Sequence, residues 1–156
     1  MKINWASSLF VIGLLLATGL ARSADRFSYS EDGSQVTDSS TGLTWKRCAE
    51  GMTWSGSTCT DTAITYTHEA ALQLGINGWR LPNIKELVSM VDDSRINPAI
   101  DPAAFPNTPS NWFWTSSPYV GNSSYAWHVD FDNGNVSNGF RRYGVGGDGN
   151  YVRLVR

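Results

Sequence analysis

The apolar residues between positions 79 and 91 change their spacing at Pro82. Before it, residues 79–81 form a short extended run, because proline lacks an N–H and favours an extended residue ahead of it. Asn83 is a favoured N-cap, and Glu86 three residues later can complete a capping box. The pattern predicts a short strand followed by a helix that begins near Asn83. Its buried face has the i, i+3, i+4, i+7 spacing of Ile84, Leu87, Val88 and Val91.

The first third of the chain carries the signals of a hairpin and then of another helix. Residues 34–38 and 43–47 read as strands that flank the turn-rich tetrad Ser39-Ser40-Thr41-Gly42. Residues 66–74 have a helical period, with Thr65 or Thr67 as the cap. We therefore expect paired strands, a loop rich in glycine, serine and threonine, and a first helix before the Pro82 junction.

Beyond the second helix the chain has no convincing helical period. Residues 95–109 hold four of the six prolines and predict an ordered loop, pinned by Ile96, Ile100 and Phe105. Asp132-Asn133-Gly134 is a strong hairpin signal in a glycine-rich remainder that is typical of a β-meander. The strands expected there are residues 114–116, 126–131, 135–138 and 151–155. The sequence predicts one α+β domain with two helices, a mostly antiparallel twisted sheet and long loops.

The N-terminus has the pattern of a secretory signal peptide over residues 1–23. Lys2 supplies positive charge, residues 9–20 are apolar, and cleavage after Ala21 or Ser23 fits the preference for small residues. An uncleaved membrane anchor is the alternative, but a comfortable span needs about 20 apolar residues. We expect a domain over residues 25–156 that is periplasmic or secreted, without stable membrane insertion after cleavage.

The charge of the expected domain argues against a nucleic-acid partner. Lys2 and Arg22 precede residue 25, so 10 of the 12 basic residues remain against all 14 acidic residues, a net charge of −4. Binding to a phosphate backbone depends on clustered Lys and Arg, and the chain has no long basic stretch.

Cys48 and Cys59 are the only cysteines, and in an exported chain we expect them to form a disulfide. Closing a loop of about ten residues contributes on the order of 2 to 3 kcal/mol to stability. A redox-active or copper-binding pair is the alternative. The spacing is neither a C-x-x-C motif nor that of a metal knuckle.

No set of residues in the sequence predicts catalysis, a cofactor or a metal site. Residues 144–149 match G-x-G-x-x-G but lead into a strand, so the context of a nucleotide site is missing. Asp130 and Asp132 share a strand face and are interpreted as a polar hairpin end. His68 and His128 are the only histidines, too few to indicate a metal site by themselves, and no G-x-S-x-G elbow occurs. His68 falls in the first expected helix, where we expect it to face solvent or to cap the helix.

The last third concentrates aromatic and basic residues that suit the binding of a sugar or a protein. Trp114, Trp127 and Tyr151 fall in expected strands and are interpreted as structural. His128 alternates with its neighbours and is expected to lie on the same face as Asp130. The remaining candidates are expected in turns. The predicted ligand-binding residues are Tyr119, Asn122, Tyr125, His128, Asn138, Arg141, Arg142 and Tyr143.

Several motifs in this order resemble the DUF1566 family, also called the Lcl C-terminal domain. They are Thr41-Gly42-Leu43-Thr44-Trp45, the Cys48 and Cys59 pair, Ala70-Ala71, Trp79-Arg80-Leu81-Pro82, Glu86-Leu87, Trp114-Thr115-Ser116-Ser117 and Tyr151-Val152-Arg153-Leu154-Val155. The resemblance covers about residues 34–156. It implies a single C-type-lectin-like domain, related in fold to formylglycine-generating enzymes, that displays a ligand surface on C-terminal loops.

The chain departs from the active members of those folds. Formylglycine-generating enzymes use a C-terminal cysteine pair for copper, and no cysteine follows Cys59. The Glu-Pro-Asn, Gln-Pro-Asp and Trp-Asn-Asp strings of calcium-dependent lectins are also missing. We therefore expect an exported, non-enzymatic module that binds a glycan or a protein at the cell envelope. The alternatives are an oxidoreductase or hydrolase on the same scaffold, or a self-associating structural subunit.

Overall fold

The N-terminal sheet has three antiparallel strands and receives the C-terminus at its edge. The computed structural model describes residues 25–144 and 147–156, and the expected signal peptide lies outside them. Strands β1 (Phe27–Tyr29), β2 (Gln35–Asp38) and β3 (Thr44–Lys46) lie in that order. The expected turn at residues 39–42 joins β2 to β3. On the far side of β3, the Thr44 N–H donates to the Arg156 carbonyl at 2.9 Å.

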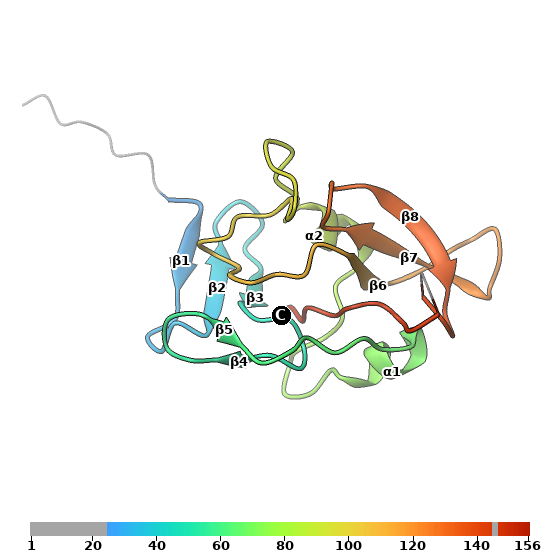
Figure 1. The fold of residues 1–156 in the computed structure, drawn as a ribbon, viewed down its shortest axis with the longest axis horizontal. Helices are drawn as coiled ribbons and strands as arrows, with labels where there is room; N and C mark the ends of the chain where they lie inside the picture. The colour runs from blue at the N-terminus through green and yellow to red at the C-terminus, as the bar shows by residue number, and fades with distance from the viewer. Residues whose placement is uncertain (1–24, 145–146) are drawn as a thin grey trace, which may run out of the picture.

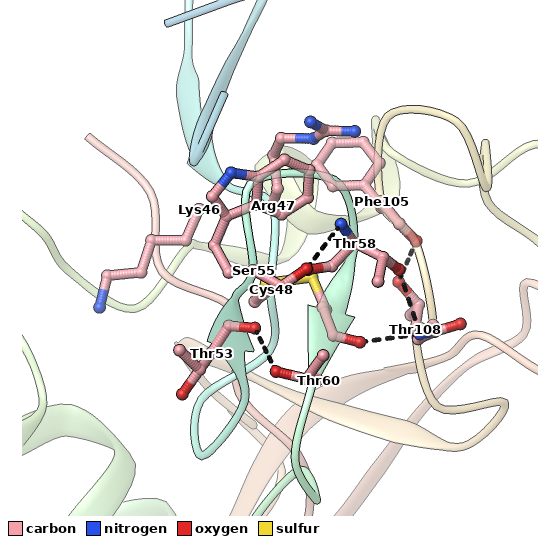
Figure 2. The surroundings of a disulfide bond; sticks show 12 residues. Lys46, Arg47, Cys48, Thr53, Ser55, Thr58, Thr60, Phe105 and Thr108 are labelled. Carbon is pink, nitrogen blue, oxygen red and sulfur yellow. Dashed lines mark hydrogen bonds between the residues drawn. A yellow bond between two sulfur atoms is a disulfide. The ribbon is translucent and has the colours of Figure 1, made fainter. Parts of the chain in front are cut away.

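The cysteine loop is a small hairpin that the sequence pattern did not predict. Strands β4 (Thr53–Trp54) and β5 (Cys59–Thr60) pair in it, and Thr60 Oγ1 donates to the Thr53 carbonyl at 3.2 Å (Figure 2). The expected disulfide is present, with the Cys48 and Cys59 Cα atoms 5.5 Å apart. Asn107 Nδ2 donates to the Cys59 carbonyl at 2.8 Å, so the proline-rich loop holds the hairpin in place.

Both helices are present, and both are short. Helix α1 (His68–Gln73) begins after Thr67, whose hydroxyl accepts from the Ala70 N–H. Helix α2 (Ile84–Val88) begins after Asn83 with the expected capping box to Glu86. The expectation of a helix reaching Val91 is wrong, because Ser89 ends α2 and the chain continues as turns. Those turns allow Met90 and Val91 both to pack against the main core.

The C-terminal sheet is a meander in the order β6-β7-β8, drawn from brown to orange-red in Figure 1. Its strands are longer than or shifted from the expected ones: β6 (Trp112–Pro118), β7 (Tyr125–Asp130) and β8 (Val136–Phe140). Helix α2 covers one face, where Leu87 shares a buried cluster with Phe113 and Val129. Helix α1 covers the other face, where Ala71 joins Trp114 and Ala126.

The predicted strands at residues 151–155 and 79–81 are not strands. Residues 150–156 run between the two sheets and make single bridges, such as Phe113 with Tyr151 and Trp45 with Val155. Residues 79–81 contribute only the bridge of Arg80 with Val155. The residues of this segment pair with one neighbour in each sheet, Phe113 of β6 and Trp45 of β3, so residues 150–156 form no continuous ladder with either sheet. The C-terminal segment therefore joins the two halves of the molecule.

The proline-rich loop is ordered over the core, with one correction to the expected anchors. Ile100 and Phe105 are fully buried, whereas Ile96 is 71% exposed. Arg47 holds the loop by donating to the Ala104 carbonyl at 2.8 Å and to the Ala103 carbonyl at 2.6 Å. A side chain from the disulfide region thus satisfies loop carbonyls in place of a regular ladder.

Candidate functional site

Four aromatic side chains lie together on one face of the C-terminal sheet. Tyr125 and Trp127 lie two residues apart on β7, so their side chains share one face of the sheet. Phe140 of β8 is paired with Tyr125 across the ladder. The ring centroids of Tyr125 and Phe140 are 4.2 Å apart, and Tyr119 lies 5.2 Å from Trp127 and 6.4 Å from Tyr125. We call Tyr119, Tyr125, Trp127 and Phe140 the aromatic face.

The aromatic face is the half of this sheet face that α2 leaves uncovered. Val129 follows Trp127 on the same side of β7 and is fully buried with Leu87 of α2. Phe140 is 49% exposed, and the other three aromatic side chains are half-buried. A contiguous group of rings open to water is typical of a binding surface.

The turn between β6 and β7 sets the position of Tyr119. Its N–H donates to the Tyr125 carbonyl at 3.1 Å, which closes the turn. A Cβ at Gly121 would lie 2.7 Å from Tyr119 Cε1, so the ring needs glycine at this position. Asn122 Oδ1 accepts from the Ser124 N–H at 2.9 Å. Asn122 therefore shapes the turn beside the aromatic face, and Val120 at its tip is 97% exposed.

Asn138 is the polar residue that accompanies the aromatic face. It is paired with Trp127 in the ladder, so its side chain lies on the same face beside the indole. Its amide is half-buried and forms no hydrogen bond to other described residues. Tyr125 lies in β7, which corrects the expectation of a turn at this position, and Asn138 lies in the middle of β8, whereas the expected strand ended there.

His128 lies on the opposite face and does not reach the aromatic face. Its ring packs 4.2 Å from Trp112 and 5.7 Å from Trp114, and the side chain is buried. Asn150 Nδ2 donates to His128 Nδ1 at 3.0 Å. Burial lowers the pKa of His128 to about 4, so the ring is neutral at pH 7. These contacts indicate a structural role, and the side chain shares its face with Asp130 as expected.

His68 also packs against Trp114 in this part of the core. Its Nε2 donates to the Thr115 carbonyl at 2.8 Å, and its ring lies 5.2 Å from the indole. Burial is the main cause that lowers the pKa of His68, and the carbonyl contact opposes it. The expectation of a solvent-facing or capping histidine is wrong, because the first turn of α1 points into the sheet.

The predicted basic residues lie at the end of β8, next to a cleft. Arg141 Nε donates to the Tyr125 carbonyl at 3.1 Å, and the Arg142 guanidinium lies 5.6 Å from the Tyr143 ring. In the described part of the chain, neither arginine forms a salt bridge. The cleft has a volume of about 520 Å³ and is lined by Thr67, His68, Glu69, Leu72, Arg141 and Arg142.

The structure does not assemble a metal site from the residues it describes. Within residues 25–144 and 147–156, no three His, Cys, Asp or Glu side chains are grouped so that they could hold an ion. Asp130 Oδ1 accepts from the Asp132 N–H at 2.9 Å, which ties the carboxylate to the hairpin turn. Val145 and Gly146 of the glycine-rich loop lie outside the described residues.

A family model described as the Lcl C-terminal domain matches residues 34–156. The chain belongs to this family. The match begins just before β2 and runs to the C-terminus, so the Lcl C-terminal domain here contains the disulfide hairpin, both helices and the aromatic face. No curated protein and no solved structure matches the chain. None of the helices in the described residues has the length and hydropathy needed to cross a membrane.

Within this Lcl C-terminal domain, the structure brings the predicted candidates into two groups and leaves one apart. Tyr119, Tyr125 and Asn138 meet at the aromatic face with Asn122 in the adjoining turn, and residues 141–143 lie at the end of β8. His128 is separate. Trp127 and Phe140 were missed as site residues. Phe140 lies two residues after Asn138, and a strand continued to this position would have placed both side chains on the same face. The expected strand ended at Asn138, so Phe140 was not recognised.

Proposed function

We propose that this chain is an exported, non-enzymatic binding module of the cell envelope that recognises a glycan through the aromatic face. The observation that carries the proposal is the cluster of Tyr119, Tyr125, Trp127 and Phe140, which is open to water beyond the part of the sheet that α2 covers. The negative face of an aromatic ring attracts the C–H groups of a sugar ring. Asn138 supplies an amide donor and acceptor for the sugar hydroxyls.

Rigid support favours this face over the surrounding loops. Tyr125, Trp127 and Phe140 lie on paired strands, so their positions are set before a ligand arrives and little side-chain entropy is lost on binding. The export component rests on the apolar run of residues 9–20 and on the disulfide, which persists in oxidising compartments.

A glycan array with the domain of residues 25–156, followed by calorimetry on the best ligand, tests the proposal. We expect Tyr125→Ala and Phe140→Ala each to weaken the affinity by about tenfold or more, the effect of losing about 1.4 kcal/mol of binding free energy. Tyr29→Ala is the matched control. Tyr29 is 50% exposed, close to the 49% of Phe140, and lies on β1 at the other end of the molecule (Figure 1).

The result that overturns the proposal is binding that Tyr125→Ala and Phe140→Ala leave unchanged, or no glycan bound by a folded domain. A ligand captured only from protein fractions, and lost in the same two variants, would assign the aromatic face to a protein partner.

A further inference from the structure

The cleft of about 520 Å³ lies between the first turn of α1 and the turn that follows β8 (Figure 1). It is on the face of the sheet that α1 covers, opposite the aromatic face. The His68 N–H donates to the Arg141 carbonyl at 2.6 Å, which joins the two walls of the cleft. Small-molecule sites have volumes of about 300 to 1,000 Å³, so this cleft is large enough to hold a ligand.

Helix α1 supplies an acidic and an apolar side chain to the cleft. His68 and Glu69 lie four and three residues before Leu72, a spacing that makes them neighbours on the helix surface. Leu72 is 46% exposed, and Glu69 is exposed. In the described part of the chain, the Glu69 carboxylate forms no salt bridge.

The turn after β8 supplies two guanidinium groups to the opposite wall. The N–H groups of Tyr143 and Gly144 both donate to the Phe140 carbonyl, at 3.2 and 2.8 Å, which closes the turn that carries Arg141 and Arg142. Arg141 Nε donates to a backbone carbonyl, and its Nη atoms have no hydrogen-bond partner among the described residues. Both cations are therefore held at the cleft without a carboxylate partner from this part of the chain.

Opposite charges line this cleft without meeting. No salt bridge among the described residues joins Glu69 to either arginine, although Arg80 and Glu86 elsewhere in the chain form one at 2.7 Å. A ligand that carries both charges can pair with the two walls at once. Two guanidinium groups against one carboxylate leave a net charge of +1, and the carboxylate opposes a dianion such as phosphate.

We propose that this cleft binds a free α-amino acid with an apolar side chain. The ligand carboxylate pairs with Arg141 and Arg142, because the planar fork of a guanidinium matches the geometry of a carboxylate. The ligand ammonium pairs with Glu69, and the ligand side chain packs on Leu72. The site is separate from the aromatic face and does not depend on the proposed function.

His68 gives the ligand ammonium a second acceptor. Its Nε2 donates to the Thr115 carbonyl, so Nδ1 carries the lone pair, and Nδ1 has no hydrogen-bond partner among the described residues. The pKa of His68 is lowered mainly by burial and also by the charge of Arg141, so the ring is neutral at pH 7. An ammonium group has only hydrogens to donate, which suits a neutral imidazole beside a carboxylate.

Isothermal titration calorimetry of the domain of residues 25–156 with L-leucine tests the proposal. Two analogues separate the charges: isocaproate is leucine without its amino group, and leucinamide is leucine without its carboxylate charge. We expect leucine to bind, and each analogue to bind about tenfold more weakly or worse, because each leaves a charged group of the cleft without its partner.

Two variants assign each charge to its wall. Arg142 and Glu69 are exposed, so their substitution by glutamine should leave the fold intact, which circular dichroism checks. We expect Arg142→Gln to weaken leucine by about fivefold or more and to change leucinamide little, and Glu69→Gln to weaken leucine and to change isocaproate little. Arg95→Gln and Glu31→Gln, at exposed positions outside the cleft, are the matched controls and should bind leucine normally.

Three results would overturn the proposal. They are a folded domain that does not bind leucine at millimolar concentration, an analogue that binds as tightly as leucine, and leucine binding that both glutamine variants leave unchanged. None of the probes contains a sugar, so a failure of these tests would leave the proposed function standing.

Discussion

Gly139 of β8 lies directly against the imidazole of His128 on β7. A Cβ at position 139 would fall 2.7 Å from His128 Cε1 and 3.1 Å from its Nδ1. The ring is held from the other side by Trp112 at 4.2 Å and by the amide of Asn150. The missing side chain at residue 139 makes room for the ring and so allows β8 to pair closely with β7.

Replacing Gly139 by alanine is therefore expected to destabilise the domain. The added methyl group must displace a ring that has no free space, and overpacking of this kind costs about 1 to 3 kcal/mol. Urea denaturation of Gly139→Ala measures the loss. In a His128→Ala background, Gly139→Ala should lower the free energy of unfolding by less than about half as much, because the imidazole that the new methyl group would contact is no longer there. An equal cost in both backgrounds would show that the ring is not the cause.

Acid is expected to destabilise the domain through His128. Its pKa in the folded protein is about 4, below the ordinary 6.5, so the unfolded chain takes up the proton first as the pH falls. The stabilisation is fully present above pH 6.5 and decreases towards pH 4, by roughly 2 to 3 kcal/mol in total. His68, whose pKa burial also lowers, acts in the same direction.

Unfolding free energies measured from pH 7 to pH 4 test this dependence, with His128→Gln as the comparison. The variant should be less stable at pH 7 and should lose less stability on acidification. A pH profile that runs parallel to that of the unmodified protein would contradict the assignment to His128.

Arg153 is expected to be the least replaceable cation of the chain. Its side chain is fully buried, stacks 4.9 Å from the Phe105 ring, and donates to the Lys46 carbonyl at 2.9 Å, the Arg47 carbonyl and Thr108 Oγ1 at 2.7 Å. Burial lowers the pKa of Arg153 to about 9, so the group is still charged at pH 7.

Arg153→Lys is predicted to cost about 2 to 4 kcal/mol, because one ammonium cannot serve partners arranged around a planar guanidinium. Arg156→Lys is the matched control three residues away. Arg156 is exposed, and its guanidinium donates to Gln35 Oε1 at 2.7 Å and lies 4.7 Å from the centre of the Trp79 ring. Lysine can keep a charge near both partners at this exposed position, so we expect a loss below about 1 kcal/mol in the same urea titration. Similar losses of stability for Arg153→Lys and Arg156→Lys would contradict the prediction that the buried guanidinium of Arg153 is needed for stability.

The disulfide is expected to stabilise the domain without taking part in ligand binding. Replacing Cys48 and Cys59 together by serine should cost about 2 to 3 kcal/mol, mainly by releasing a loop in the unfolded chain. The hairpin lies away from β7 and β8 (Figure 1), so glycan affinity of the folded double variant should stay within about twofold. Calorimetry below the unfolding temperature measures this, and a lost affinity would link the hairpin to the site.

Local sequence signals predicted the elements that depend on neighbouring residues. The capping box of Asn83 and Glu86, the Thr67 cap, the turn at residues 39–42 and the hairpin at Gly134 are all present. Each depends on one side chain or one backbone angle within a few residues, so the chain around it needs no further information. The cysteine pair was predicted because no other cysteine exists.

The assignment of the aromatic residues was only partly predictable. Tyr119 and Tyr125 were placed in the site and Trp127 in the core, although all three lie side by side on one face. An alternating strand shows which side chains share a face, but it does not show which part of that face another element covers. Here a five-residue α2 covers the Val129 end and stops short of Trp127.

The sequence by itself determined the family, the two capped helices, the paired strands and the disulfide, because these follow from local spacing and residue chemistry. Tertiary structure alone decided that residues 150–156 join two sheets, that both histidines pack beside Trp114, and that Phe140 completes an open aromatic face. Each of these depends on contacts between residues far apart in the chain. The hydrophobic effect is non-directional and favours the burial of any apolar surface, so the sequence alone does not show which apolar side chains remain in water. That is decided only when all elements pack together.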